Sequence, residues 1–176
     1  MFRTSLSYVQ IAILCLAVLL TSLSRGSSEE GSLPSPAGQT ILTIEGKIGV
    51  TNADGKAVFD RAMLEQVGTV TIETTTPWFD GPVKFEGVPA NAVMDLVAAE
   101  GTEVVAVALN DFRTTIPLAD FSKYRVILAL KRNGEYMPIR DKGPLFIVYP
   151  YDSDPQLQSQ QFYARSVWQL ARLIVR

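Results

Sequence analysis

Residues 133–152, NGEYMPIRDKGPLFIVYPYD, combine the residue types expected in the wall of a ligand pocket. Arg140, Asp141 and Lys142 offer hydrogen-bond donors and an acceptor directly before a Gly-Pro pair. An apolar run follows and ends at 149–152 in aromatic, proline, aromatic and acidic residues. The pattern predicts a charged loop, a buried strand and an aromatic rim. The alternative is a solvated turn whose following tyrosines face the core and the surface.

The composition limits the chemistry of such a pocket. The 176 residues include no histidine and one cysteine, Cys15. Histidine is the commonest general base and metal ligand, and its absence excludes Ser-His and Cys-His dyads. Lysine and arginine total 16 against 18 acidic residues, and no basic run or zinc-ligand spacing indicates nucleic-acid binding. At 47% hydrophobic residues, the chain is expected to form one globular domain.

The N-terminus is typical of an export signal. One positive side chain precedes the apolar run 11–23, which is short for a membrane span of about 20 residues. Ser22 and Ser24 are small residues at the two positions that signal peptidase inspects. We expect a cleaved signal peptide at 1–24 and a periplasmic protein, with an uncleaved anchor as the alternative. Cleavage would remove Cys15, leaving no thiolate to bind a metal.

Turn residues and apolar periodicity divide the rest of the chain. Residues 25–40 are rich in Gly, Ser and Pro and predict a flexible lead, followed by a domain at 41–176. The patterns predict short helices at 57–68, capped by Asp60, and at 89–101, while 162–175 fits either a helix or a closing strand. The expected strands are 41–48, 68–76, 83–88, 102–111, 112–117, 125–132 and 144–150. The predicted fold class is α+β: a single compact mixed-sheet domain with two or three short helices.

Four segments together resemble a family of small exported proteins built on the molybdopterin-binding domain of the sulfite-oxidase type. They are FEGVPANAVMDLV (85–97), ALNDFRTTIP (108–117), RDKGPLFIVYPYD (140–152) and SVWQL (166–170). The resemblance runs from the first expected strand to the C-terminus. It implies the sulfite-oxidase type of fold and a pterin ligand, either a reduced pterin or a molybdopterin-like one.

The sequence departs from that family at one position with chemical consequences. The resemblance places a molybdenum-binding cysteine between the second strand and the helix, where this chain reads ETTTPWFDGPVKFEG. Hydroxyls of Thr74, Thr75 or Thr76 would be poor substitutes for a soft thiolate. We therefore expect no metal and no catalytic residue. Family members without the cysteine look like pterin-binding proteins, some associated with inner-membrane enzymes of cyclic-di-GMP turnover.

A pterin calls for three kinds of side chain. Its pyrimidine edge matches a carboxylate, its carbonyl and ring nitrogens accept hydrogen bonds from arginine, and its faces stack on aromatic rings. Arg140 is the expected donor, Asp141 or Asp152 the acid, and Tyr149 or Tyr151 the stacking face. The candidate pterin-binding residues are Trp78, Asp111, Arg140, Asp141, Lys142, Tyr149, Tyr151 and Asp152.

Three of these assignments have structural alternatives. Trp78 and Phe79 would be costly to expose, so they form either a lid over the core edge or a pocket wall. Asn110 and Asp111 fit a hairpin turn, in which case Asp111 contacts no ligand. Trp168 lies in an apolar setting and is expected to pack in the core.

Three functions remain open on these residues. The first is a non-catalytic, periplasmic pterin-binding protein that regulates an inner-membrane partner with a periplasmic region. The second is a molybdopterin-dependent oxidoreductase that holds its cofactor without a cysteine. The third is a structural module that kept the fold and lost the pocket.

Overall fold

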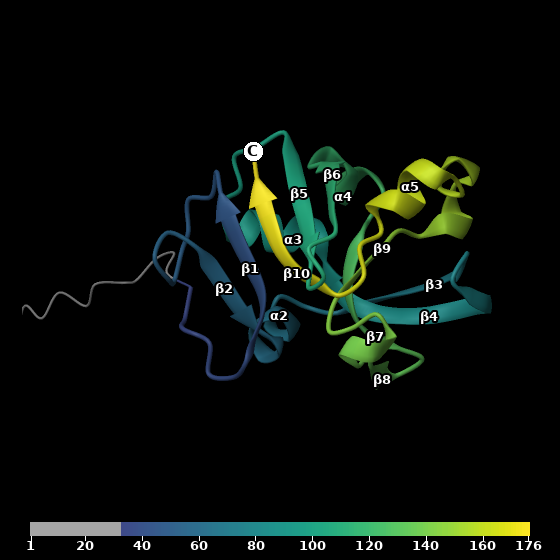
Figure 1. Cartoon of the computed structure of the whole chain (residues 1–176), viewed down its shortest axis with the longest axis horizontal. Coiled ribbons are helices and arrows are strands. Elements are labelled where there is room, and N and C mark those ends of the chain that lie inside the picture. Colours follow the sequence, from purple (N-terminus) through teal and green to yellow (C-terminus); the bar gives the residue numbers. More distant parts are fainter. Residues whose placement is uncertain (1–32) are drawn as a thin grey trace, which may run out of the picture. The chain divides into compact units, whose positions relative to one another are not determined.

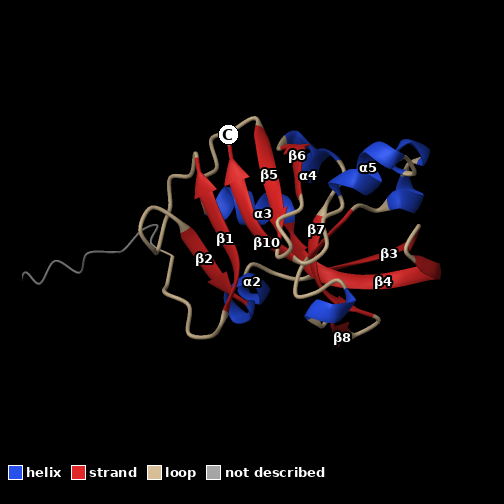
Figure 2. Cartoon of the chain, viewed as in Figure 1, coloured by secondary structure: helices blue, strands red, loops and turns tan. Residues whose placement is uncertain are grey.

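Two five-stranded β-sheets organise residues 33–176, which are the residues that this computed structural model describes (Figures 1 and 2). The predicted signal peptide at 1–24 and residues 25–32 of the predicted lead lie outside the described residues. Within residues 33–176, no helix combines the length and apolar character needed to cross a membrane.

The first sheet is mixed and joins the two ends of the described chain. Its strands, in spatial order, are β2 (Ala57–Asp60), β1 (Thr40–Gly46), β10 (Leu170–Val175), β5 (Glu103–Ala108) and β6 (Arg113–Pro117). β1 and β10 run parallel, and the other neighbours are antiparallel. Figure 1 shows the C-terminal strand β10 lying between β1 and β5. The sheet therefore forms only when the last strand joins the first.

The second sheet is antiparallel throughout. Its strands are β3 (Val70–Thr76), β4 (Phe79–Pro89), β7 (Ile127–Arg132) and β8 (Glu135–Tyr136) in that order, with β9 (Phe146–Val148) pairing β7. Asn133 and Gly134 both adopt positive φ between β7 and β8, as a tight hairpin turn requires. The PWFDGP segment lies near β9, because the ring of Trp78 packs edge-on against that of Phe146 at 5.4 Å.

The helices are short and lie between strands. The α-helices are α2 (Arg61–Gln66), α3 (Ala90–Leu96), α4 (Ala119–Lys123) and α5 (Gln160–Arg165). Residues 33–176 also form three 3-10 turns, η1 (Ile139–Asp141), η2 (Tyr151–Ser153) and η3 (Pro155–Leu157). Helices of this length are not stable alone, so tertiary contacts must hold each one in place.

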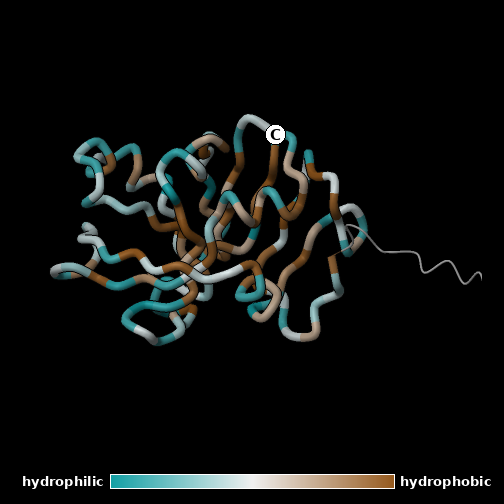
Figure 3. The backbone as a smooth tube through the Cα atoms, turned by 180° about the vertical axis from the view of Figure 1, so that it is seen from behind, coloured by the Kyte–Doolittle hydropathy of each residue, from teal (hydrophilic) through white to brown (hydrophobic). Residues whose placement is uncertain are grey.

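One cluster of buried side chains connects both sheets. It includes Leu42 and Ile44 of β1, Phe85 of β4 and Leu128 of β7, all fully buried. Figure 3 shows the apolar colour along the inner strands and the polar colour in the surface loops. The apolar periodicity of the strands therefore sets which face of each sheet is buried.

The coarse class predicted from the sequence, an α+β domain, is confirmed. Several details differ. The helix expected at 57–68 begins only at Arg61, because Ala57–Asp60 pairs with β1. The helix expected at 89–101 ends at Leu96. The ambiguous segment 162–175 contains both alternatives, since α5 ends at Arg165 and β10 begins at Leu170.

Asp60 connects the start of the described chain to α2. Its Oδ1 accepts a hydrogen bond of 2.9 Å from the backbone N–H of Met63, as a helix N-cap does. Its Oδ2 accepts from the backbone N–H groups of Ala37 and Gly38 at 2.9 and 2.7 Å. The N–H of Met63 and that of Gly38 hold the pKa of the Asp60 carboxyl below its usual value. Residues 33–40 of the predicted lead are thus attached to the domain, with Leu33 buried.

We predict that Asp60→Ala lowers the midpoint of thermal unfolding by a few degrees at neutral pH. The folded pKa of Asp60 is depressed, so its stabilising effect is present above the unfolded pKa of about 4 and is lost as pH falls through the folded pKa. The variant should therefore approach the wild type at acidic pH. Thermal melts across pH measure this, with Asp54→Asn in an exposed turn as the control. A difference between the thermal midpoints of the variant and the wild type that stays constant with pH would contradict the stabilising role of the Asp60 carboxylate.

Candidate functional site

An aromatic cavity of about 290 Å³ lies between the β5–β6 turn and the α5 region. Its ring-bearing walls are Trp78, Phe112, Tyr163 and Trp168. The remaining lining residues are Ala108, Asn110, Gln160, Ala164, Ser166 and Val167. The cavity therefore offers flat apolar faces together with amide and hydroxyl groups.

Trp78 is the centre of the aromatic wall. Its ring meets Trp168 and Tyr163 edge-on, with centroids 5.7 and 5.8 Å apart. It also meets Phe146 of β9 edge-on at 5.4 Å, which anchors it to the core. Edge-to-face packing of this kind fixes the ring planes. Trp78 is thus a pocket wall whose back packs on the core, so it combines the two roles predicted from the sequence.

Lys142 lies against the same rings. Its Nζ is 4.0 Å from the centroid of Trp168 and 5.8 Å from that of Trp78, so the ammonium makes cation–π contacts with both. Burial lowers the pKa of Lys142, while the neighbouring Asp141 acts in the opposite direction. Lys142 has positive φ, and a Cβ at the following Gly143 would collide with the carbonyl oxygen of Met137. This backbone geometry holds residues 142–143 close to Met137 and directs the Lys142 side chain toward Trp78 and Trp168.

Asp141 is engaged within the protein. It accepts two hydrogen bonds from Arg132 of β7, at 3.1 and 2.6 Å. The Arg132 guanidinium lies over the ring of Phe79 at 4.4 Å, and its hydrogen bonds hold the pKa of Asp141 below its usual value. The Arg132–Asp141 pair therefore attaches the 140–142 loop to β7. Both carboxylate oxygens of Asp141 already accept a hydrogen bond within the protein.

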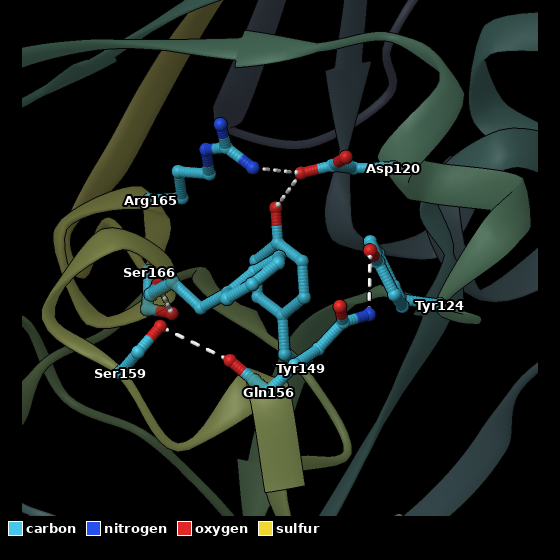
Figure 4. A network of polar contacts seen from close by, with 8 residues as sticks. Asp120, Tyr124, Tyr149, Gln156, Ser159, Arg165 and Ser166 are labelled. Atoms are coloured by element: carbon cyan, nitrogen blue, oxygen red, sulfur yellow. Dashed lines mark hydrogen bonds and ion pairs between the residues drawn. The ribbon is translucent and has the colours of Figure 1, made fainter. Parts of the chain in front are cut away.

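Tyr149 and Tyr151 are fully buried and present no exposed stacking face. The Tyr149 hydroxyl donates to Asp120 Oδ2 at 3.0 Å, and the same oxygen accepts from Arg165 Nη1 at 2.7 Å (Figure 4). Burial raises the pKa of Tyr149 well above its usual value, and Asp120 raises it further. The Tyr151 hydroxyl forms a short hydrogen bond with Ser166, which lines the cavity. Both tyrosines thus support the cavity from behind.

Asp152 is engaged with the edge of β3. Its carboxylate accepts from the backbone N–H of Thr75 at 2.6 Å and also from the Thr75 hydroxyl. The hydroxyl of Thr75 is the main cause that holds the pKa of Asp152 below its usual value. Asp152 therefore connects η2 to the second sheet, away from the cavity lining.

Asp111 and Arg140 are exposed, and only Asp111 is next to lining residues in the chain. Asp111 lies between the lining residues Asn110 and Phe112, and its contact with Arg113 is a weak ion pair of 3.9 Å. Arg140 makes no ion pair with any of residues 33–176. Gln169, next to Trp168, donates to the carbonyl of Ile139 at 2.7 Å, which brings the Arg140 loop to the segment that lines the cavity. Of the eight predicted residues, only Trp78 belongs to the lining itself.

The expectation that Trp168 packs in the core is wrong. Its side chain is 37% exposed, it lines the cavity, and it carries the Lys142 ammonium. Phe112, Asn110 and Tyr163 were not predicted either. Phe112 directly follows a predicted turn and is 51% exposed, and an aromatic residue at such a position was the available signal.

A larger groove of about 780 Å³ lies beside β3. Its walls include Val70 to Glu73 of that strand, the start of α3 and the α4–β7 connection. Tyr124 supplies an aromatic side chain, and Lys123 lies over its ring at 4.6 Å. Among residues 33–176, Tyr124 is the one aromatic residue in the lining of this groove. The groove therefore lacks the several rings that line the smaller cavity.

Comparison with known proteins gives no match to a protein-family model and no match to a curated protein. The candidate site therefore stands on its geometry and on the four segments quoted above.

We predict that Asp120→Ala destabilises the protein by about 3 kcal/mol, because it leaves the largely buried Arg165 charge unpaired. It also removes the acceptor of the Tyr149 hydroxyl. Denaturant unfolding measures the loss. Asp111→Ala breaks an exposed ion pair instead and should cost less than about 1 kcal/mol. Equal losses in the two variants would show that the buried pair does not hold the α5 region.

Proposed function

We propose that the protein binds a pterin in the aromatic cavity, without turnover, and regulates a membrane partner in the periplasm. The observation that carries the proposal is the cavity walled by Trp78, Phe112, Tyr163 and Trp168. Stacking on such faces suits a flat heterocycle. The amide of Asn110 offers hydrogen bonds to its edge, whereas the Ser166 hydroxyl is already bonded to the Phe162 carbonyl and to Tyr151.

The charged groups that complete the site come from its surroundings. Asp111 is the carboxylate that matches the pyrimidine N–H and amino group of a pterin. Arg140 is the donor to its carbonyl and ring nitrogens, and it is free of other ion pairs within residues 33–176. Lys142 supports Trp168 through its cation–π contact.

The pterin assignment and the sulfite-oxidase type of fold both derive from the resemblance described above. The two sheets with few helices are compatible with such a domain. A non-catalytic role is favoured because Thr74 and Thr75, which belong to the segment where the resemblance places the cysteine, already bond to the backbone N–H and the carboxylate of Asp152. The partner would be an inner-membrane protein with a periplasmic region, such as an enzyme of cyclic-di-GMP turnover.

We predict saturable binding of a tetrahydropterin that quenches tryptophan fluorescence. Both tryptophans of the chain contribute to the cavity, so the signal reports on this site alone. Trp168→Ala removes a stacking face and should weaken binding about tenfold or more. Arg140→Ala removes a charge-assisted hydrogen bond and should weaken it roughly ten- to a hundredfold. Arg140→Lys should also bind poorly, since an ammonium lacks the planar fork.

Arg125→Ala is the matched control, because Arg125 is an exposed arginine of the larger groove. Its affinity should equal that of the wild type, and affinity should change little with salt because the contacts are short-range. Absence of saturable binding would refute the pterin proposal. Loss of binding in Arg125→Ala alone would place the ligand in the larger groove.

We also predict that the protein purified from a host that makes the molybdenum cofactor carries far less than one molybdenum per chain. The reason is the absence of a thiolate from ETTTPWFDGPVKFEG. Elemental analysis beside a molybdenum enzyme from the same host decides the point. One metal per chain would favour the oxidoreductase alternative.

A further inference from the structure

β3 is an edge strand, and alternate residues along it direct their backbone N–H and C=O groups away from the sheet. Lys84 of β4 exchanges hydrogen bonds with Asn133 beyond the end of β7, so its backbone points away from β3. Glu73 is the register partner of Lys84 and must point its own N–H and C=O the other way, to the free edge. Thr71 and Thr75, two residues on either side, have the same orientation. Asp152 satisfies the N–H of Thr75, which leaves Thr71 and Glu73 available.

The other sheet edges among residues 33–176 are blunted. The side chain of Asn52 occupies both backbone groups of Val58 on β2. β6 begins with Arg113 and ends with Pro117, and β8 has only two residues. β9 is covered by Val167, whose carbonyl accepts from the N–H of Ile147. Natural proteins protect edges in these ways because an open edge pairs with other chains.

β3 carries one charged side chain between Val70 and Glu73, that of Glu73, and none of the other protections. It has seven residues, it contains no proline or lysine, and its irregularity lies beyond this stretch, between Thr74 and Thr76. Val70 is 41% exposed beside the larger groove, although it is a large apolar residue. A water-exposed apolar side chain next to unpaired backbone groups is the signature of a strand-pairing site.

We propose that β3 pairs antiparallel with β3 of a second copy of this chain, forming a two-fold dimer with a continuous sheet. The two residues with outward backbone groups then face each other, Thr71 of one copy opposite Glu73 of the other. Ile72 meets Ile72 of the second copy on the two-fold axis. Every backbone hydrogen bond that the open edge lacks is supplied by the same edge of the other molecule.

The side chains fit this register. Val70 and Ile72 point to the buried face of the sheet together with Phe85, their cross-strand neighbour, so apolar residues extend that face across the axis. On the opposite face Glu73 has Lys84 on one side and Thr71 of the second copy on the other, so no two like charges stand directly opposite. Each copy offers one such edge, and pairing therefore closes at two molecules.

Thr71→Pro tests the proposal because it removes an outward N–H while leaving the bonds from β3 to β4 intact. In the dimer the change deletes two backbone bonds, one from each copy, and should raise the dissociation constant roughly ten- to a hundredfold. Sedimentation equilibrium over a wide concentration range measures this. Thr71→Ala keeps the N–H and should dimerise as the wild type does. Thermal melts should show all three proteins folded.

The register has its own test. Ile72→Cys, in a Cys15→Ser background, should form an intermolecular disulfide rapidly under mild oxidation, since residues opposite each other in a non-hydrogen-bonded pair bring their side chains close. Glu86→Cys on β4 should not. A wild type that stays a single copy at every concentration would overturn the proposal, whether or not another polypeptide pairs with β3. So would a dimer that Thr71→Pro leaves unchanged.

Discussion

The buried charge pair of Asp120 with Arg165 is the interaction on which the aromatic cavity depends. Residues 149–169 leave β9, form η2, η3 and α5, and return as β10, and they supply six of the ten residues that line the cavity. None of these short helices would form alone. Arg165, at the end of α5, and Tyr149, at the start of the excursion, both bond to the same oxygen of Asp120. One carboxylate on α4 therefore closes the excursion at both ends.

The sequence predicted the local features that depend on neighbouring residues. The Asp60 cap and the strands β5 and β6 are formed as the patterns indicated. It could not predict that β10 inserts between β1 and β5, because that arrangement depends on pairs such as Thr43 with Arg172 and Leu170 with Ala108, which are far apart in the sequence. The segment 162–175 was ambiguous for a related reason. Its apolar spacing suits both states, and only pairing with β1 selects the strand at its end.

Of the eight candidate site residues, one lines the cavity and most of the others lie beside or behind it. The charged loop and the aromatic rim do lie beside the cavity, through Lys142 on Trp168 and Tyr151 on Ser166. Sequence patterns identify which residues are chemically capable, whereas the direction of each side chain follows from packing. Asp141 could have faced a ligand, but Arg132 at the end of β7 donates two hydrogen bonds to it. The phenols of Tyr149 and Tyr151 are likewise used inside the protein.

In this chain without histidine, no charged side chain of residues 33–176 lines the aromatic cavity. The rings of the lining pack on one another, while the charges of Arg132, Asp141 and Lys142 act behind them. This arrangement has an energetic reason. A charge placed inside so small a cavity would need a partner to offset its desolvation, and each partner would narrow the space for a planar ligand. The charges of Arg132, Asp141 and Lys142 interact outside the lining, so they hold the rings in position and leave the cavity open.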